Sequence, residues 1–173
     1  MIPPQSFRIR TRQHDDQVWI EGLLGERWGG SGVAVHDELF EPKVLPALIA
    51  DEHAGLVTYR VCDDVAEVVT LDAVVPRQGV GTMLLSSLVE ALRQRGCRLL
   101  RLTTTNDNLD ALRFYQRFGF RLAGIRIGAV ARARGLKPTI PLIGRHGIPI
   151  RDEIDLQHDL TEQGATVTGT LLA

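Results

Sequence analysis

A short glycine loop between a valine-rich run and an amphipathic segment constrains the fold of this chain more than any other feature. Residues 65–75, VAEVVTLDAVV, are rich in β-branched side chains and contain no helix breaker, which predicts a buried strand. After the loop of residues 77–82, apolar side chains recur at helical spacing up to Gly96, which would end the helix: Met83, Leu84, Leu85, Leu88, Val89 and Leu92. The sequence therefore predicts a strand, a glycine loop and a helix in succession.

Gly79 and Gly81 in this loop would leave the backbone of the first helical turn open to a bound anion. Glycine has no Cβ to screen the backbone, the first N–H groups of a helix lack internal partners, and the helix dipole favours negative charge there. The loop differs from a dinucleotide-binding fingerprint, which needs a third glycine where Leu84 stands, and from a P-loop, which needs a lysine. A pyrophosphate site and a tight turn that uses glycine for geometry alone are both open at this point.

A second strand and a second helix follow directly. Residues 97–105 predict a strand, and Asp107 or Asn108 is a suitable N-cap for a helix that ends at Gly119. The apolar side chains of this helix fall near one face: Leu109, Leu112, Tyr115 and Phe118. Residues 65–120 thus predict a βαβα unit, in which the two helix-linked strands run parallel.

This unit resembles the cofactor-binding core of the GNAT family of N-acetyltransferases. That core consists of a strand, a loop ending in G-x-G/A, a helix, a second strand and a short helix written N-x-x-A-x-x-x-Y-x-x-x-G-F. The last pattern is matched at every position, by Asn108, Ala111, Tyr115, Gly119 and Phe120. The loop departs from the family in one respect, because Pro76 stands where Gln or Arg is usual. The resemblance implies an α/β (α+β) fold with a mixed central β-sheet of about six or seven strands flanked by helices.

The resemblance also implies that acetyl-CoA (coenzyme A) is the cofactor. The glycine loop would hold its phosphates through backbone N–H groups, and a strand N–H near Leu71 or Ala73 would stabilise the thioester oxygen as it becomes an oxyanion. The cofactor-binding residues implied in this way are Leu71, Ala73, Val74, Arg77, Gln78, Gly79, Val80, Gly81, Thr82, Asn108, Ala111 and Tyr115. The alternative for Asn108 is a purely structural role as an N-cap.

Two residues are predicted to be catalytic. Tyr115 matches the family's general acid, and a phenol with a pKa of ~10 stays protonated at neutral pH, above a thiol at ~8.5. Glu67 is an isolated carboxylate in the apolar run, where the histone-acetylating members of the family spell a similar A-E-[IV]-V, and it is predicted to be the general base. The alternatives are a core tyrosine and an exposed glutamate at the beginning of a strand.

Trp28, Asp152 and Glu153 are predicted to bind the acceptor. Trp28 precedes the glycine-rich residues 29–32, in the region after the first strand where the family usually builds acceptor specificity. Asp152 and Glu153 stand at the start of the last strand, where carboxylates would hold a cationic acceptor. The alternatives are a plain connector for Trp28 and a solvated strand end for the two carboxylates.

The remaining chain predicts one domain over residues 1–162 and a flexible tail over residues 163–173. Short connections make the early strands antiparallel. The expected elements are strands at residues 7–11, 33–36, 44–50, 56–61 and 121–130, a helix at 15–24 ended by Gly25, a loop at 131–147, and a last strand in which apolar and polar residues alternate from 153 to 160.

Composition argues against several classes of function. The chain has 20 basic and 21 acidic residues and a net charge of −1, so nothing in its overall charge favours nucleic acid or a membrane as a partner. Cys62 and Cys97 lack metal-binding spacing and are expected to be small buried hydrophobes in a reducing compartment, and no metal is predicted. The N-terminus lacks the apolar core of a signal peptide, so the protein is expected to be cytoplasmic. A homodimer is one option for its oligomeric state.

The predicted function is transfer of an acetyl group from acetyl-CoA to a primary amine, on a small-molecule or protein acceptor, by direct attack in a ternary complex. One alternative is a sensor module on the same fold that binds acyl-CoA and has no transferase activity. Another is an unrelated βαβ domain whose glycine loop is only structural. Binding of coenzyme A would distinguish the transferase and the sensor module from the unrelated βαβ domain. Turnover of an amine would distinguish the transferase from the sensor module.

Overall fold

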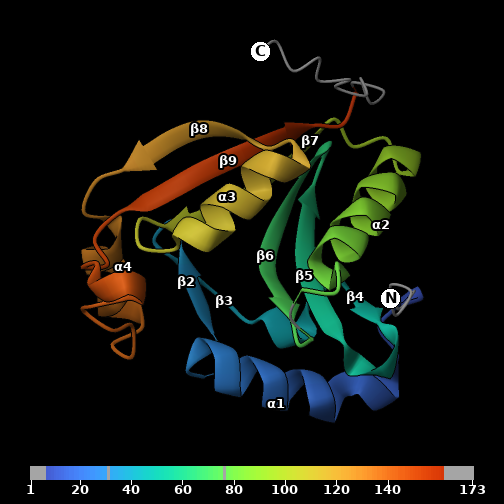
Figure 1. The fold of residues 1–173 in the computed structure, drawn as a ribbon, viewed down its shortest axis with the longest axis horizontal. Helices are drawn as coiled ribbons and strands as arrows, with labels where there is room; N and C mark the ends of the chain where they lie inside the picture. The colour runs from blue at the N-terminus through green and yellow to red at the C-terminus, as the bar shows by residue number, and fades with distance from the viewer. Residues whose placement is uncertain (1–6, 31, 76, 162–173) are drawn as a thin grey trace, which may run out of the picture.

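Seven strands form one mixed β-sheet in the computed structural model, which describes residues 7–30, 32–75 and 77–161 (Figure 1). The predicted α+β class, with a mixed sheet flanked by helices, is confirmed. The order of strands in the sheet is β1-β4-β5-β6-β7-β9-β8, and β2 and β3 form a separate two-stranded sheet. The strands are β1 Ile9–Thr11, β2 Val33–Val35, β3 Glu38–Phe40, β4 Ala47–Ala50, β5 Gly55–Cys62, β6 Val65–Ala73, β7 Leu99–Thr105, β8 Arg121–Arg126 and β9 Glu153–Asp159; the helices are α1 Gln17–Trp28, α2 Val80–Gln94, α3 Leu109–Phe118 and α4 Ala129–Leu136.

The connections determine the direction of each strand, as the sequence predicted. Tight turns join β4 to β5 and β5 to β6, and these pairs are antiparallel. Helix α2 joins β6 to β7, and this pair is parallel. The last strand, β9, inserts between β7 and β8 and pairs with both in the antiparallel sense. The sheet therefore places the carboxyl ends of β6 and β7 at the same edge, next to the start of α2.

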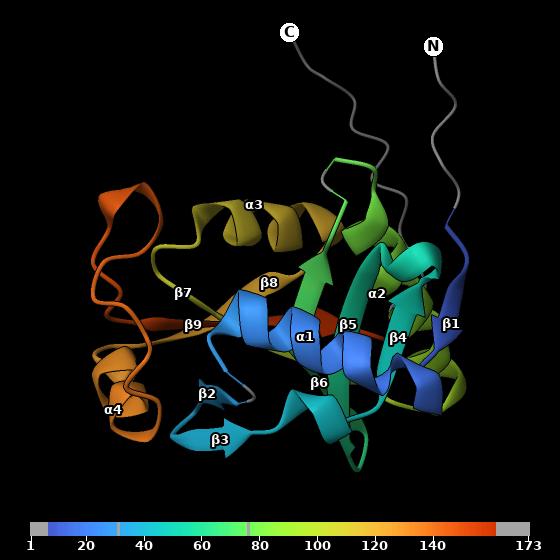
Figure 2. The ribbon, with the colours of Figure 1, turned by 90° about the horizontal axis from the view of Figure 1, so that it is seen from below.

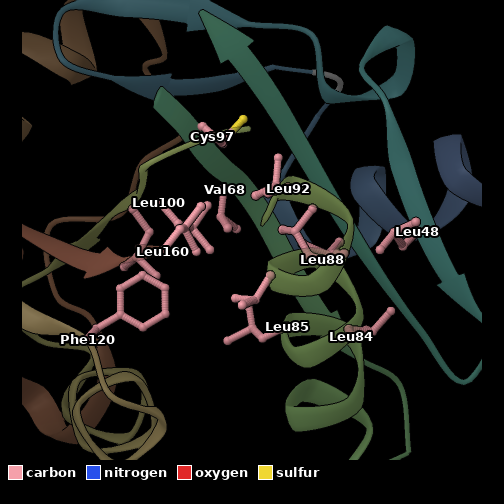
Figure 3. Close-up of a cluster of buried hydrophobic side chains, with 14 of the residues drawn as sticks. Leu48, Val68, Leu84, Leu85, Leu88, Leu92, Cys97, Leu100, Phe120 and Leu160 are labelled. Carbon is pink, nitrogen blue, oxygen red and sulfur yellow. The ribbon is translucent and has the colours of Figure 1, made fainter. Parts of the chain in front are cut away.

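Helices α1 and α2 cover opposite faces of the sheet (Figure 2). The apolar side of α2 contributes Leu84, Leu85 and Leu88 to the larger core, and each of them is fully buried. Figure 3 shows Leu85 and Leu88 projecting toward Leu100 and Phe120. On the other face, Ile20 and Leu24 of α1 pack in a smaller core against β4 and β5. Burying such side chains contributes about 1.5–3 kcal/mol each, so the two cores fix the sheet between the helices.

The ends of α3 form as the sequence predicted. The Asn108 side chain accepts a hydrogen bond from the Ala111 N–H at 3.4 Å, which is the predicted N-cap. The helix ends at Gly119, whose φ of 116° is open to glycine and strained for other residues. The expected strand at 97–105 begins at Leu99 instead of Cys97, because Cys97 closes the turn after α2 through a hydrogen bond to the Leu92 carbonyl.

The N-terminal third departs from the prediction in three places. Helix α1 continues through Gly25 to Trp28 and stops at Gly29, which has a left-handed φ of 66°. Its apolar stripe keeps packing beyond Gly25, since Trp28 contacts the smaller core. The strand expected at 33–36 ends at Val35 and pairs with β3, which was not predicted. The strand expected at 44–50 begins only at Ala47, after a 3₁₀ turn over Pro42–Val44.

The segment after α3 also departs from the prediction. The strand expected at 121–130 stops at Arg126, and residues 129–136, expected to be strand and loop, form α4. This segment is rich in alanine and arginine, which favour helix, and the Asp152 carboxylate accepts the Gly128 N–H at 2.7 Å in front of its first turn. Strand β9 was predicted correctly, but its first polar residue, Glu153, is buried instead of solvated. The predicted tail at 163–173 lies outside the described residues.

The two cysteines differ. Cys97 is buried as expected, whereas Cys62 at the end of β5 is exposed, because the strand reaches the surface at its turn into β6.

Within the described ranges, no helix has both the length and the apolar character needed to cross a membrane.

Candidate active site

Strands β6 and β7 separate halfway along their length, and the separation creates the main cleft of the molecule. The two strands pair only from Val65 opposite Leu99 to Val68 opposite Leu102, although both continue beyond. Directly after this point, Thr58 and Tyr59 of β5 pair with Thr70 and Val68, so Val69 is an extra residue and forms a β-bulge. A bulge bends its strand, which explains why β6 turns away from β7 here. Figure 1 shows β6 and β9 diverging as a V.

The resulting cleft has a volume of about 930 Å³ and is lined by β6, the end of β7, the start of α2 and one side of α3. It contains most of the predicted cofactor-binding residues: Leu71, Ala73, Arg77, Gly79, Val80, Gly81, Thr82, Asn108, Ala111 and Tyr115. Val74 and Gln78 do not line it. The backbone N–H of Val74 donates instead to the Ala54 carbonyl at 2.8 Å, and Gln78 is exposed on the loop.

The glycine loop has the geometry of an anion site at a helix start. Gly79 adopts a left-handed φ of 76° and is the residue before α2, so the N–H groups of the first turn have no intrahelical acceptor. A Cβ at Gly81 would lie 3.2 Å from Cζ of Phe114. A side chain at this position would therefore meet α3, at a point where Gly81 and Phe114 both line the cleft. Gly81 allows α2 and α3 to approach closely, and a Cβ at Gly79 would meet nothing within 4 Å.

Tyr115 packs against the core and also lines the cleft. Its ring packs beside Phe114 and Phe120, with ring centroids 5.3 and 5.7 Å away. Burial raises the pKa of the phenol well above its usual value, and the nearby charge of Asp72 raises it further. The side chain is consequently a neutral O–H donor at physiological pH. It can give a proton to a group in the cleft that becomes negatively charged.

Asp72 is a buried carboxylate in the cleft that the sequence prediction missed. It is 9% exposed, and the Trp28 indole Nε1 donates to its Oδ2 at 2.9 Å. Burial raises the pKa of Asp72, although the hydrogen bond from Trp28 and the charge of Arg27 oppose the shift. A carboxylate with a raised pKa, in a cleft and without a cation bound to it in the described part of the chain, is a candidate proton acceptor. The available signal was the same as for Glu67, an acidic residue in an apolar strand.

Glu67 occupies a different environment. It lies in the part of β6 that is still paired with β7, opposite Arg101, and it does not line the cleft. Its carboxylate is bound by the Arg60 guanidinium at 2.7 Å. The position on β6 is as predicted, but the carboxylate serves as an ion-pair partner at the root of the cleft.

A second cavity of about 370 Å³ adjoins the cleft on the side of α1. It lies among the end of α1, strand β2, helix α4 and the start of β9, and it shares lining residues with the cleft: Arg27, Trp28, Thr103, Thr104 and Asn108. Trp28 and Glu153, two of the predicted acceptor residues, line this cavity. Asp152 does not, because its carboxylate turns to the Gly128 N–H. The Lys137 ammonium closes the rim by donating to the Trp28 and Gly32 carbonyls.

In the described ranges, no group of three or more His, Cys, Asp or Glu side chains is arranged to bind a metal ion. The charged side chains of the larger cleft are mostly basic. Arg27, Arg77, Arg117 and Arg145 line it, against the carboxylates of Asp72 and Asp110. The cleft therefore favours an anionic ligand, and the arginines and the start of α2 could hold phosphate groups.

Comparisons with known proteins agree with this geometry. Residues 11–120 match the family model described as "Acetyltransferase (GNAT) family". The uncharacterized protein YxbD of Bacillus subtilis (strain 168) is 37% identical over 145 residues, which cover 82% of this chain and 91% of that protein. Two solved structures have the same fold. A Bacillus subtilis acetyltransferase in complex with CoA has a TM-score of 0.63 at 20% identity, covering 89% of this chain and 99% of the other. A GNAT family acetyltransferase from Elizabethkingia anophelis with acetyl-CoA bound has a TM-score of 0.62 at 20% identity, covering 88% and 97%.

Proposed function

This chain belongs to the GNAT family of acetyltransferases, and we propose that it transfers the acetyl group of acetyl-CoA to a primary amine in a ternary complex. The observation that carries the proposal is the separation of β6 from β7 beside the start of α2. The separation leaves backbone N–H groups of β6 without a strand partner on the β7 side. A thioester in the opening would find such a donor near Leu71 or Ala73 for its developing oxyanion.

The cleft suits the cofactor in size and in charge. A volume of about 930 Å³ lies at the large end of ligand sites, as a nucleotide with a long arm requires. The phosphates would lie at the start of α2, where unpaired N–H groups and the helix dipole favour anions, with Arg77 close by. Asn108 and Ala111 would border the arm from the side of α3.

We propose that Asp72 and Tyr115 handle the proton transfers of the reaction. Asp72 would accept the proton of the incoming ammonium, so that the amine nitrogen can attack the thioester carbon and form the new C–N bond. Tyr115 would give its proton to the sulfur as the C–S bond breaks, and its oxygen would take up the second proton of the nitrogen as the amide forms. Asp72 takes precedence over Glu67 as the base in this proposal, because Asp72 lines the cleft and Glu67 is bound to Arg60 before the strands separate. Trp28 would hold Asp72 in place through its indole N–H.

The acceptor would enter from the smaller cavity. That cavity opens into the cleft along the side chains that the two share, on the sheet face that carries Asp72. An amine arriving there would approach the thioester from the side opposite α2. The cofactor and the acceptor would thus enter from different sides, as direct transfer in a ternary complex requires.

Two measurements test the function. Calorimetric titration with coenzyme A is expected to show binding, and a panel of primary amines with acetyl-CoA is expected to release free thiol. Binding without turnover of any amine would favour the sensor module that lacks transferase activity. Absence of binding would overturn both readings and leave the glycine loop as a structural turn.

A further inference from the structure

Glu153 is a buried carboxylate that forms no ion pair with any residue that the structure describes. It is 3% exposed, and the one hydrogen bond that its side chain accepts from a described residue is a long one, from the His36 N–H at 3.4 Å to Oε2. The two groups whose positive charge acts on it, His36 and Arg126, bind Asp155 instead, at 3.0 and 2.9 Å. Burial raises the pKa of Glu153, because the charged carboxylate loses the stabilisation that water would give it. A carboxylate desolvated in this way is stabilised in its charged form when a cation reaches it.

The carboxylate of Glu153 faces a cavity and is separated from the proposed reaction centre. Glu153 lines the smaller cavity and pairs with Thr105 across the β7–β9 ladder. Strand β7 therefore stands between Glu153 and the opening beside β6, and neighbouring strands are about 4.8 Å apart. The pKa values of the two carboxylates also respond to different groups: that of Glu153 to His36, Arg126 and Asp155, and that of Asp72 to Trp28 and Arg27. An ammonium positioned by Asp72 leaves Glu153 free for another group.

The walls of the smaller cavity limit the kind of molecule that could carry a second group to Glu153. Its volume of about 370 Å³ is at the small end of ligand sites, and many of its lining side chains are apolar: Val33, Val35, Val130, Ala133, Ile140, Pro141 and Ile150. Glu153 is its one carboxylate in the described residues. The Lys137 ammonium, at the rim, already donates to carbonyls at the end of α1 and in the following loop. The cavity thus suits a short apolar spacer that ends in a single cation.

We propose that the acceptor is a short diamine-like molecule, in which one amine is acetylated and a second cationic group, a short apolar spacer away, binds Glu153. The inference rests on the proposed transferase function and makes its acceptor class specific. Longer polycations are disfavoured, because a third ammonium would find no further carboxylate among the described residues of this cavity and would meet Arg27 and Lys137. Simple monoamines are acetylated less efficiently, because they leave Glu153 buried and uncompensated.

The test compares diamines with amino alcohols of the same chain length, which replace the second ammonium by a hydroxyl. The pairs are 1,4-diaminobutane with 4-aminobutan-1-ol, and 1,6-diaminohexane with 6-aminohexan-1-ol. Thiol release from acetyl-CoA gives kcat/KM for each amine, and the value for a diamine is halved for its two equivalent ends. We expect the better diamine to exceed its amino alcohol by about tenfold or more, as a charge-assisted hydrogen bond provides.

Glu153→Gln keeps the shape of the side chain and removes its charge, and we expect it to abolish this preference while the amino alcohols are still acetylated. The matched control is Glu26→Gln, which removes the same charge from an exposed position of α1 outside the cavity lining and should preserve the preference. If turnover is too slow to measure, calorimetric affinity of each amine for the protein–CoA complex replaces kcat/KM in the same comparison.

Two outcomes overturn the inference: equal values for diamine and amino alcohol in the unmodified protein, or a preference that survives Glu153→Gln. Either can occur while coenzyme A binds and amines are acetylated, in which case the proposed function stands. Failure to bind coenzyme A would instead remove the proposed function, and the inference with it.

Discussion

Replacement of Asp72 by asparagine is expected to lower activity and raise stability at the same time. In the unmodified protein the Trp28 indole N–H donates to Oδ2 of Asp72 at 2.9 Å. Asparagine fits the same space and keeps a carbonyl oxygen that can accept this hydrogen bond. It cannot accept a proton from the acceptor. If Asp72 is the general base, kcat/KM at neutral pH should fall by roughly 10²- to 10⁴-fold, and part of the loss should be recovered at high pH, where the amine deprotonates unaided.

The expected gain in stability follows from the raised pKa of Asp72. The folded protein holds this proton more tightly than the unfolded chain, so the free energy of unfolding falls as pH rises from the ordinary carboxyl pKa of 3.8 to the raised folded value, and stays lower above it. Each unit of that shift corresponds to ~1.4 kcal/mol. An asparagine at this position has no such charge to bury. Asp72→Asn should therefore stabilise the protein at neutral pH and have little effect at the lowest pH at which the protein stays folded.

The pKa of Asp72 links the loss of activity to the gain in stability, and two assays measure it. The pH dependence of kcat/KM in the unmodified enzyme gives the pKa of the essential base, and urea unfolding of both proteins across pH gives the change in unfolding free energy. The gain at neutral pH should match the shift in the kinetic pKa, at ~1.4 kcal/mol per unit. Glu67→Gln is the comparison variant, because it tests the alternative base. An unchanged pH–rate profile in Asp72→Asn, together with a large loss in Glu67→Gln, would refute the assignment of Asp72 and restore Glu67.

Two further substitutions test other parts of the site. Tyr115→Phe keeps the ring between Phe114 and Phe120 and removes the proton donor, so kcat should fall by roughly 10²-fold with unchanged calorimetric affinity for coenzyme A; unchanged turnover would leave Tyr115 as a core residue only. Gly81→Val should weaken coenzyme A binding and also lower the melting temperature, because even its Cβ would lie 3.2 Å from Phe114; weaker binding at an unchanged melting temperature would show that this crowding is unimportant.

The geometry around the glycine loop could be predicted because it is local in sequence. Residues 65–120 carry the strand, the glycine loop and the cap of α3, and each element there is specified by its own residues: β-branched side chains in β6, Gly79 with its left-handed φ, and Asn108 at the N-cap. A pattern of this kind determines geometry without knowledge of distant contacts. The cleft lining accordingly contains most of the residues expected to bind the cofactor.

The choice of Asp72 as the proposed base could not be made from the sequence, because a bulge changes the parity of β6. Glu67 and Asp72 lie five positions apart, and a regular strand would place their side chains on opposite faces. The extra residue, Val69, brings both to the face away from α2: Glu67 contacts Arg60, and Asp72 contacts Trp28. Nothing in VAEVVTLDAVV distinguishes a bulged strand from a regular one. The choice between the two carboxylates depends on where β6 and β7 separate, which is a property of the whole sheet.

The smaller cavity, where we propose that the acceptor binds, could not be predicted in the same way, because distant contacts build it. Its walls come from α1, β2, α4 and β9, and they are joined by bonds between side chains and backbone that span long stretches of sequence. Lys137 binds the carbonyls of Trp28 and Gly32, and Asp152 binds the N–H in front of α4. Asp152 was expected to bind the acceptor; in the structure its carboxylate accepts the Gly128 N–H in front of α4 and does not line the smaller cavity. Glu153, its neighbour in sequence, faces the interior of that cavity because successive strand residues point to opposite sides. Residues that shape this cavity therefore include one outside its lining, Asp152, as well as lining residues such as Lys137, and in the proposed function both kinds would affect acceptor specificity.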